Sequence, residues 1–585
     1  MKKYIIVTGG VCSSLGKGIA SASLGSLLES RGLRVRIAKI DPYINVDAGT
    51  MSPYQHGEVY VTDDGAETDL DLGNYARFTS SPLSRANSIT TGQIYQEVIQ
   101  REREGRYLGR TVQVIPHITD RIKQRVYAVG EAADVDVTIV EIGGTVGDIE
   151  SVPFLEAVRQ MIHEQGHENV LSVHLTLVPE VTSGELKTKP TQHSVKELRE
   201  IGIQPDVLLC RAPWPLDDDM RRKIALFTNV DYEAVVSAYD VLSTIYEIPL
   251  MYAEQKLDEI VLRKLRVDTA DPAFRTPDLS AWHQVVEVFR NCRKRVRIAV
   301  VGKYIDLQDS YKSVDEALFH GGIANATHVE LVKIDSERLE KIEDFTTVFE
   351  NIDGILVPGG FGSRGIEGMI RTARHAREMD IPYFGICLGM QVMVIEYARH
   401  KLGFAEADST EFHPDTQHPV ITLLEEQIDV KNYGGTMRLG SSKSKLLPGT
   451  LIRSIYGSEI IAERHRHRYE VSNRYRRQLH EAGLEVTAVT EDDALVESVS
   501  WAGHPWGLGV QYHPEFLSKP TNAHPLFRTF VAACLARMTK EGRDDQAAGC
   551  VDASGTAENR RTPRTVSQDA RTENHDHLPK TRVPG

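Results

Sequence analysis

The segment Phe384–Gln391, FGICLGMQ, places one cysteine between two glycines in the pattern Gly385-x-Cys387-x-Gly389. Small residues on both sides of a nucleophile permit a sharp turn from a strand into a helix, and such a turn exposes the nucleophile. The free N–H groups and the dipole at the start of that helix favour a thiolate. An isolated cysteine of this kind could equally be a buried structural residue, so a catalytic role requires partners elsewhere in the chain.

Two further segments supply the groups that a catalytic cysteine needs. GVQYHPEF contains His513 and Glu515, and alternation along a strand end would place both side chains on one face. A histidine that takes the thiol proton and a carboxylate that orients the histidine form a Cys–His–Glu relay. In LVPGGFG, Gly359 and Gly360 can aim a backbone N–H at a developing oxyanion. These segments favour nucleophilic catalysis at Cys387.

The first half of the chain carries a glycine-rich loop of another kind. VTGGVCSSLGKGIASASL follows an apolar strand and opens a helix, so its N–H groups can wrap phosphate oxygens while Lys17 adds a positive charge. It departs from the usual phosphate loop, because five residues separate Gly10 from Gly16 and Gly18 replaces the hydroxyl residue that normally holds Mg²⁺. The loop predicts nucleotide binding, with a tight turn in a dehydrogenase-like fold as the alternative.

Acidic and basic residues nearby extend this prediction. Asp69 and Asp71 lie in GAETDLDLG, and Glu141 ends an apolar strand, the position at which α/β sheets build their sites. Carboxylates together with phosphate oxygens suit Mg²⁺, although acidic residues are most often solvated surface groups. The segment 187–192, KTKPTQ, crowds lysines and hydroxyls at a helix start. It suits a second polyphosphate, and an exposed basic loop would have the same composition.

The elements that position these residues alternate between strand and helix. Continuous apolar strands are expected in the first half, with helical patterns such as 151–166 between some of them; the strands are 4–7, 35–41, 136–144, 170–179 and 206–213. This alternation predicts a parallel sheet covered on both faces. Strands resume at 296–304, 354–360 and 382–389. We therefore predict an α/β protein of two doubly wound domains.

The predicted domains are separated by a change in composition. The first spans 1–268, a linker with a short helix spans 269–294, and the second domain spans 295–538. The tail, 539–585, is predicted to be disordered, because residues 541–585 contain four Val or Leu residues and no aromatic residue.

The composition narrows the possible functions. A net charge of -14 disfavours a general nucleic-acid binder, but it leaves small phosphate ligands open. The six cysteines form no CxxC pair and no metal-ligand spacing, which fits a reduced, cytoplasmic compartment. No apolar stretch reaches about 18 residues and the N-terminus lacks the pattern of a signal peptide, so no membrane association is expected.

The second half resembles the class I glutamine amidotransferase family, because PGGFG, GICLGMQ and HPEF occur in the family's order over about 295–538. The resemblance implies that Cys387 attacks the side-chain amide of glutamine, forms a thioester and releases ammonia. His513 would be the base and Glu515 its orienter. Without the family, the run RHRHR at 464–468 would be interpreted as a solvated edge strand. The implied glutamine contacts are Gly360, Leu388, Gly389, Met390, Gln391, Glu411 and Arg468.

Long runs across 1–538, among them KIDPYINVDAGTMSPYQHGEV and KTKPTQHSVKELR, resemble the CTP synthase family. The family pairs a P-loop-like synthetase (amidoligase) domain with a class I glutaminase domain. The resemblance implies that ATP phosphorylates O4 of UTP and that ammonia displaces the phosphate to give CTP. It further implies Mg²⁺, GTP as an allosteric activator, CTP as a feedback inhibitor, and a homotetramer that can polymerise.

The family pattern assigns nucleotide sites residue by residue. ATP contacts are implied at Ser14, Leu15, Gly16, Lys17, Gly18, Ile19 and Asp71, with adenine near Tyr239, Asp240 and Val241. Mg²⁺ would be held by Asp71 and Glu141. UTP contacts are implied at Ser13, Lys187, Thr188, Lys189, Pro190, Thr191, Gln192 and Lys223, and CTP would add Asp148, Ile149 and Glu150. The segment 434–440, with Arg438, resembles a lid over the GTP-activated site, and His56 and Val59 resemble residues along the ammonia path.

Two other functions compete with this interpretation. A related synthetase could use its glutaminase on a different acceptor, but the runs KTKPTQHSV and GTMSPYQHGEV belong to the UTP enzyme. A purely structural filament subunit would have no need for Cys387, Lys17 or Glu141, and all three are present.

Overall fold

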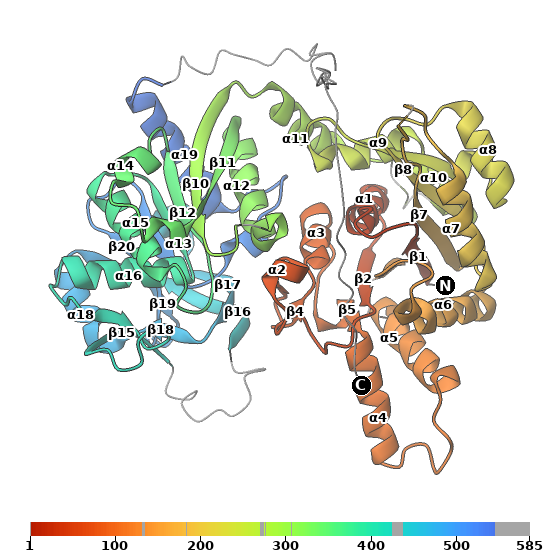
Figure 1. The fold of residues 1–585 in the computed structure, drawn as a ribbon, viewed down its shortest axis with the longest axis horizontal. Coiled ribbons are helices and arrows are strands. Elements are labelled where there is room, and N and C mark those ends of the chain that lie inside the picture. The colour runs from red at the N-terminus through yellow and green to blue at the C-terminus, as the bar shows by residue number, and fades with distance from the viewer. Residues whose placement is uncertain are drawn as a thin grey trace, which may run out of the picture.

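The computed structural model describes residues 2–131, 135–182, 184–268, 274, 276–305, 307–423 and 437–543. These residues form two α/β halves that lie side by side, each built around its own large sheet (Figure 1). The predicted α/β fold class is therefore confirmed. The exact limits of the predicted domains remain a prediction. The predicted tail, 539–585, lies outside the described residues except for 539–543. Its first two residues belong to α19 (Pro525–Lys540).

The N-terminal sheet has seven strands in the order β5-β2-β6-β1-β7-β8-β9. Every neighbouring pair is parallel; Ile5 of β1, for example, lies between Ile139 of β6 and Leu171 of β7. The strands are β1 (Lys3–Gly9), β2 (Val35–Asp41), β5 (Ser88–Thr90), β6 (Val137–Ile142), β7 (Val170–Leu177), β8 (Val207–Ala212) and β9 (Val235–Tyr239). Because all strands run the same way, the residues after each strand meet at one carboxyl edge.

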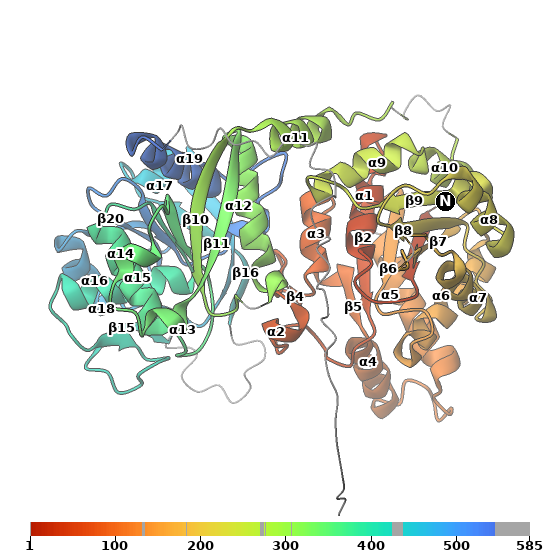
Figure 2. The same ribbon diagram turned by 45° about the horizontal axis from the view of Figure 1, so that its top comes forward.

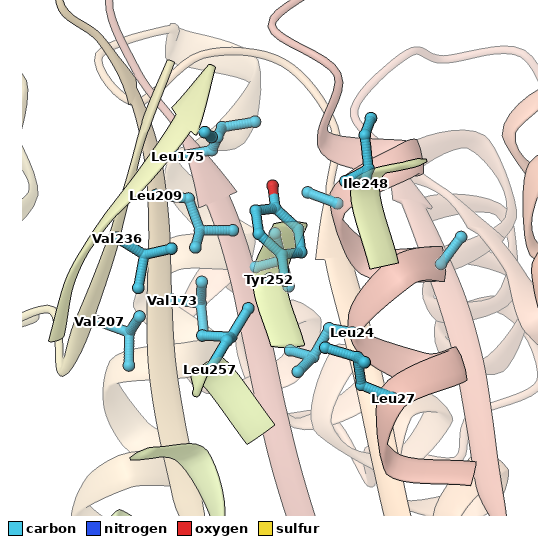
Figure 3. Packing of buried hydrophobic residues seen from close by; sticks show 14 of the residues in the cluster. Leu24, Leu27, Val173, Leu175, Val207, Leu209, Val236, Ile248, Tyr252 and Leu257 are labelled. Atoms are coloured by element: carbon cyan, nitrogen blue, oxygen red, sulfur yellow. The ribbon is translucent and has the colours of Figure 1, made fainter. Parts of the chain in front are cut away.

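Helices cover both faces of this sheet, as the sequence predicted. On one face α1 (Lys17–Ser30), α9 (Ile248–Glu254) and α10 (Leu257–Lys264) pack against β7, β8 and β9. Figure 3 shows Tyr252 and Leu257 between Leu24 and Leu27 of α1 and the valines and leucines of these strands. On the other face α5 (Thr119–Glu131) and α6 (Val152–Gln165) pack against β1 and β6.

The C-terminal sheet has nine strands and is mixed. Its parallel part runs β11-β10-β12-β13-β21, and an antiparallel part continues as β20-β19-β16-β17. The parallel strands are β10 (Lys294–Gly302), β11 (Thr327–Asp335), β12 (Gly354–Val357), β13 (Tyr383–Ile386) and β21 (Gly507–Val510). The antiparallel strands are β16 (Arg438–Leu446), β17 (Ile460–His467), β19 (Leu484–Thr490) and β20 (Val496–Trp501). The sequence did not indicate this extension.

A short segment of the N-terminal half reaches the C-terminal half. It contains α2 (Pro53–His56), β3 (Tyr60–Val61) and β4 (Glu67–Thr68), which lie on the side facing β16 and β17 (Figures 1 and 2). Arg464 of β17 donates hydrogen bonds to the Tyr60 hydroxyl at 2.6 Å and to Asp63 at 2.6 Å. Arg466 donates to Glu67 at 2.8 Å. Polar side chains of β17 therefore join the two halves.

Candidate active site

Cys387 occupies a sharp turn between β13 and α16 (Leu388–His400). It is the residue immediately before the helix, and its φ of 53° lies in the left-handed region that non-glycine residues rarely adopt. A Cβ on Gly385 would lie 2.5 Å from the Gly389 carbonyl oxygen, and a Cβ on Gly389 would lie 2.0 Å from the Val357 carbonyl oxygen. Both glycines are needed because backbone segments approach each other so closely here.

His513 and Glu515 form a buried pair beside this turn. The distance from His513 Nδ1 to Glu515 Oε1 is 2.6 Å. Burial alone would lower the pKa of His513, but Glu515 and the Cys387 thiol outweigh it and raise that pKa to about 10. The two residues are not on a strand as expected, since β21 ends at Val510 and Glu515 lies in a short 3₁₀ helix, Pro514–Leu517.

Gly359 lies close to both the histidine and the cysteine. A Cβ at this position would lie 2.9 Å from His513 Cε1 and 3.6 Å from Cys387 Cβ, so a larger side chain would intrude between base and nucleophile. Gln511, which the sequence analysis did not single out, donates a long hydrogen bond to Cys387 Sγ at 3.7 Å. Its own Oε1 accepts from Gln391 Nε2 at 3.3 Å.

A cavity of about 210 Å³ opens over these groups. Its lining includes Cys387, His513, Glu515, Gly360 and Arg468 from the C-terminal half. The N-terminal half also contributes to the lining, with Gly49, Met51, Pro53, Glu58 and Val59. The structure therefore brings the expected nucleophile, base and orienter together in a space that both halves enclose.

The expected glutamine contacts occupy two environments. Glu411 accepts a hydrogen bond from the Gly362 N–H at 2.7 Å, and burial raises its pKa although Lys303 and Arg468 oppose this effect. Lys303 was not predicted; burial lowers its pKa to about 8. Leu388, Gly389, Met390 and Gln391 belong to the first turn of α16 and are buried. The Met390 and Gln391 N–H groups donate to the Cys387 carbonyl oxygen at 3.1 Å and 3.2 Å, so the N–H of Leu388, the first residue of the helix, is the candidate to serve an oxyanion.

The phosphate-loop candidates lie at the carboxyl edge of the N-terminal sheet. Lys17 begins α1, and its Nζ donates to the Gly144 carbonyl oxygen at 2.8 Å. Burial lowers the pKa of Lys17. Gly18 faces Asp71 so closely that a Cβ there would lie 2.0 Å from Asp71 Oδ1. The structure thus brings Lys17, Gly18 and Asp71 together.

A group of buried carboxylates surrounds Lys39 of β2, which the sequence analysis also missed. Lys39 Nζ donates to Glu141 Oε1 at 2.9 Å and to Asp71, and it lies 3.9 Å from Asp41. Burial raises the pKa of Asp69 to about 6, with Asp71 and Glu141 adding to the shift, and burial together with Asp69 raises the pKa of Asp41. Burial would also raise the pKa of Asp71, but Lys39 lowers it. Several carboxyl groups therefore crowd around one lysine.

The remaining nucleotide candidates are distributed along the same edge. Asp148 accepts from the Thr145 N–H at 2.7 Å in the loop after β6, and Ile149 and Glu150 are exposed beside it. Lys187 to Gln192 precede and begin α7 (Lys189–Glu200). Lys223 is exposed on α8 (Asp218–Thr228), whose Phe227 ring lies 5.9 Å from Lys189 Nζ.

The expected adenine contacts lie beside a separate hollow. Tyr239 and Val241 line a cavity of about 360 Å³ after β9, together with residues of α11 (Ser280–Asn291). Asp240 between them is exposed and pairs with Arg211.

The residues assigned by resemblance to the GTP lid and to the ammonia path lie in different environments. Arg438 is the first residue of β16; it pairs with Glu497 at 2.6 Å and with Glu470 at 3.5 Å, and its side chain is only 16% exposed. Residues 434–436 of the expected lid lie outside the described residues. Val59 lines the cavity over Cys387, and His56 is exposed on α2.

Comparison with known proteins places both halves in families. Residues 3–267 match the family model "CTP synthase N-terminus", and residues 306–533 match "Glutamine amidotransferase class-I". A solved Trypanosoma brucei CTPS glutaminase domain with bound acivicin is 39% identical, covers 41% of this chain and 94% of its own, and gives a TM-score of 0.39.

Full-length relatives match almost the whole chain. CTP synthase of Geobacter sulfurreducens is 59% identical over 540 residues, or 92% of this chain and 99% of the relative. The enzymes named CTP synthase from Carboxydothermus hydrogenoformans and Aquifex aeolicus are each 56% identical, over 92% of this chain and 99% and 100% of their own lengths. Among the described residues, no helix combines the length and apolarity needed to cross a membrane. The chain belongs to the CTP synthase family of glutamine-hydrolysing C–N ligases.

Proposed function

We propose that this enzyme aminates UTP to CTP at the expense of ATP, with ammonia released from L-glutamine or supplied free. The observation that carries the proposal is the cavity over Cys387, because residues of both halves line it. Ammonia released there lies next to the N-terminal half, which contains the candidate nucleotide-binding residues. The family membership of both halves supports the same reaction.

In the glutaminase half, Cys387 attacks the glutamine side-chain amide. His513 accepts the thiol proton and returns it to the departing ammonia, while Glu515 fixes the ring through the 2.6 Å contact. N–H groups near Gly360 and Leu388 stabilise the oxyanion. Glu411 and Arg468 suit the charged amino and carboxylate groups of the amino acid. Water then hydrolyses the thioester to glutamate.

In the synthetase half, ATP phosphorylates O4 of UTP, and ammonia displaces that phosphate at C4. Residues 14–19 and 239–241 bind ATP, with Lys17 directed at the transferred phosphate. Ser13, residues 187–192 and Lys223 bind UTP, and CTP shares that site with the help of residues 148–150. Phosphoryl transfer depends mainly on positioning and charge neutralisation, which a lysine and a metal can provide.

The carboxylates around Lys39 fit a magnesium ion. Asp71 and Glu141 would hold it, because both carboxylates converge on Lys39 at the carboxyl edge of the sheet, and carboxylate oxygens are the donors that Mg²⁺ prefers. Within the described ranges, no group of three or more His, Cys, Asp or Glu side chains is arranged to hold a metal ion by itself, so phosphate oxygens would supply further ligands. When bound, Mg²⁺ would neutralise the phosphate charge.

Regulation and assembly follow from family membership alone. GTP would activate glutamine hydrolysis, CTP would inhibit, and the active form would be a cytoplasmic homotetramer that can polymerise, acting in de novo pyrimidine nucleotide synthesis.

The decisive experiment separates the two chemistries. Cys387→Ala should abolish glutamine-dependent CTP formation and leave formation from ammonium chloride intact, because the two reactions occupy different halves. Lys17→Ala should abolish both, since phosphorylation precedes either nitrogen source. Ultraviolet absorbance of CTP measures both rates. Loss of the ammonium-dependent reaction in Cys387→Ala, or its survival in Lys17→Ala, would contradict the assignment.

A further inference from the structure

Glu58 is a carboxylate at the junction of the two halves with no role in the mechanism above. It follows α2 in the N-terminal half and lines the cavity that contains Cys387, His513 and Glu515. Burial raises the pKa of Glu58 to about 7; Arg77 opposes this shift and Glu515 reinforces it. Glu58 and the Cys387, His513 and Glu515 group therefore line the same cavity.

The C-terminal half holds Glu58 at two points. The Ser313 backbone N–H donates to Glu58 Oε2 at 2.7 Å, and the Ser313 hydroxyl contacts Glu58 Oε1. Arg77 Nη1 donates to the same hydroxyl oxygen at 3.0 Å. Since arginine can only donate, the hydroxyl proton is free to point at Glu58. Both carboxylate oxygens therefore have fixed positions.

This arrangement continues toward the nucleotide site. Arg77 Nη2 donates to Asn74 Oδ1 at 2.8 Å, and Asn74 Nδ2 donates to Asp71 Oδ1 at 3.1 Å. These three residues lie on α3 (Asp71–Phe78), the helix that begins at the proposed metal carboxylate. Glu58 is therefore tied both to the glutaminase cavity and to the helix that carries Asp71.

The carboxylate retains unused capacity. An ionised carboxylate offers about four acceptor positions, and Ser313 occupies two of them. Ammonia has three N–H donors, and ammonium has four with a positive charge. We propose that Glu58 is a binding site for the nitrogen released at Cys387, accepting its N–H hydrogen bonds as it passes from one half to the other. The inference rests on the proposed function.

The test is the number of CTP molecules formed per glutamate. Glu58→Gln keeps the shape and an acceptor for Ser313 but removes the charge, and loss of a charged hydrogen bond should lower this ratio by about tenfold. Glu58→Asp, which keeps the charge, should restore part of the ratio. Ser313→Ala, which loosens Glu58 without altering it, should lower the ratio less than Glu58→Gln. Glutamate and CTP are measured in one reaction, at a pH above the pKa of Glu58.

The matched control is Asp63→Asn, which removes another carboxylate that crosses the junction but does not line the cavity. Its ratio should equal that of the unmodified enzyme. An unchanged ratio in Glu58→Gln would overturn the inference. So would a loss of CTP formation from saturating ammonium chloride as large as the loss from glutamine, since that result would place Glu58 in the synthetase reaction. If the unmodified enzyme forms no glutamate or no CTP, the proposed function itself fails.

Discussion

Replacement of Lys39 by methionine tests the charge balance of the proposed magnesium site. Lys39 is 5% exposed and contacts Asp71 and Glu141, with Asp41 at 3.9 Å. Methionine has a similar length and no charge. Lys39→Met therefore leaves several buried carboxylates without their cation while it preserves most of the packing.

The expected destabilisation follows from the burial of these groups. Removal of one partner of a buried ion pair typically costs about 3–5 kcal/mol, because the remaining charge is uncompensated. At about 2–4 °C per kcal/mol for a domain of roughly this size, the Tm of the N-terminal half should fall by about 6–20 °C. Mg²⁺ that binds only the folded protein raises the free energy of unfolding by about 2.7 kcal/mol when its concentration is about 100 times its Kd.

Thermal unfolding with and without Mg²⁺ measures both effects. The matched control is Lys123→Met, since Lys123 is also a buried lysine. It pairs with Glu164 at 2.6 Å and with Asp120 at 3.1 Å, and the side chains of both partners are more than 40% exposed. It should lose less stability and gain nothing from Mg²⁺. The reasoning is refuted if Lys39→Met melts at the unmodified temperature, or if Mg²⁺ stabilises both variants equally.

Two further predictions concern the glutaminase half. His513→Ala should lower glutamine hydrolysis by about 10²–10⁴, the usual contribution of a positioned base, and CTP formation from ammonium chloride should persist; equal loss of both would argue against its role. Gly389→Ala should lower the free energy of unfolding by about 1–3 kcal/mol, seen as a lower Tm, and impair hydrolysis, because its Cβ would meet the Val357 carbonyl oxygen at 2.0 Å; normal stability and turnover would show that the turn can relax.

The fold could be predicted where strands are long and apolar. The segments around β1, β2, β6, β7 and β8 are continuous apolar runs, and buried parallel strands require such runs. β5 has three residues, too few to show a pattern. β16 (RLGSSKSKL) is rich in serine and lysine, and β17 (IIAERHRH) ends in alternating arginine and histidine, so their sequences resemble solvent-facing strands.

The run RHRHR shows why composition alone was insufficient there. β17 does lie at the edge of its sheet, as the solvated-strand interpretation requires. However, Arg464 is 6% exposed, and His465 and His467 are buried. The segment around β3 covers Arg464 through Tyr60 and Asp63, a contact between residues about 400 positions apart that no local pattern encodes.

The site was predictable to the extent that chemistry depends on local motifs. Gly385, Cys387 and Gly389 lie within one turn, and His513 and Glu515 are two positions apart, so spacing alone identified them as candidates. Lys39 left one clue, a lysine within the apolar run VRIAKID, since lysine is rarely buried unless it is paired. Gln511 and Glu58 left none, because their roles depend on residues more than 100 positions away.

One short segment links the two chemistries. The chain from Gly49 to Val59 lines the cavity over Cys387, and only about ten residues later it supplies Asp69 and Asp71 to the carboxylate group. Because coupling energy is demonstrated only by perturbing both ends, a double-mutant cycle between Glu58 and Asn74 would distinguish a mechanical link from mere proximity. The coupling energy is calculated from the CTP-per-glutamate ratios of the two single variants and the double variant. A value near zero would mean that the hydrogen bonds through Ser313 and Arg77 hold the two halves together but do not couple the glutaminase cavity to the nucleotide site.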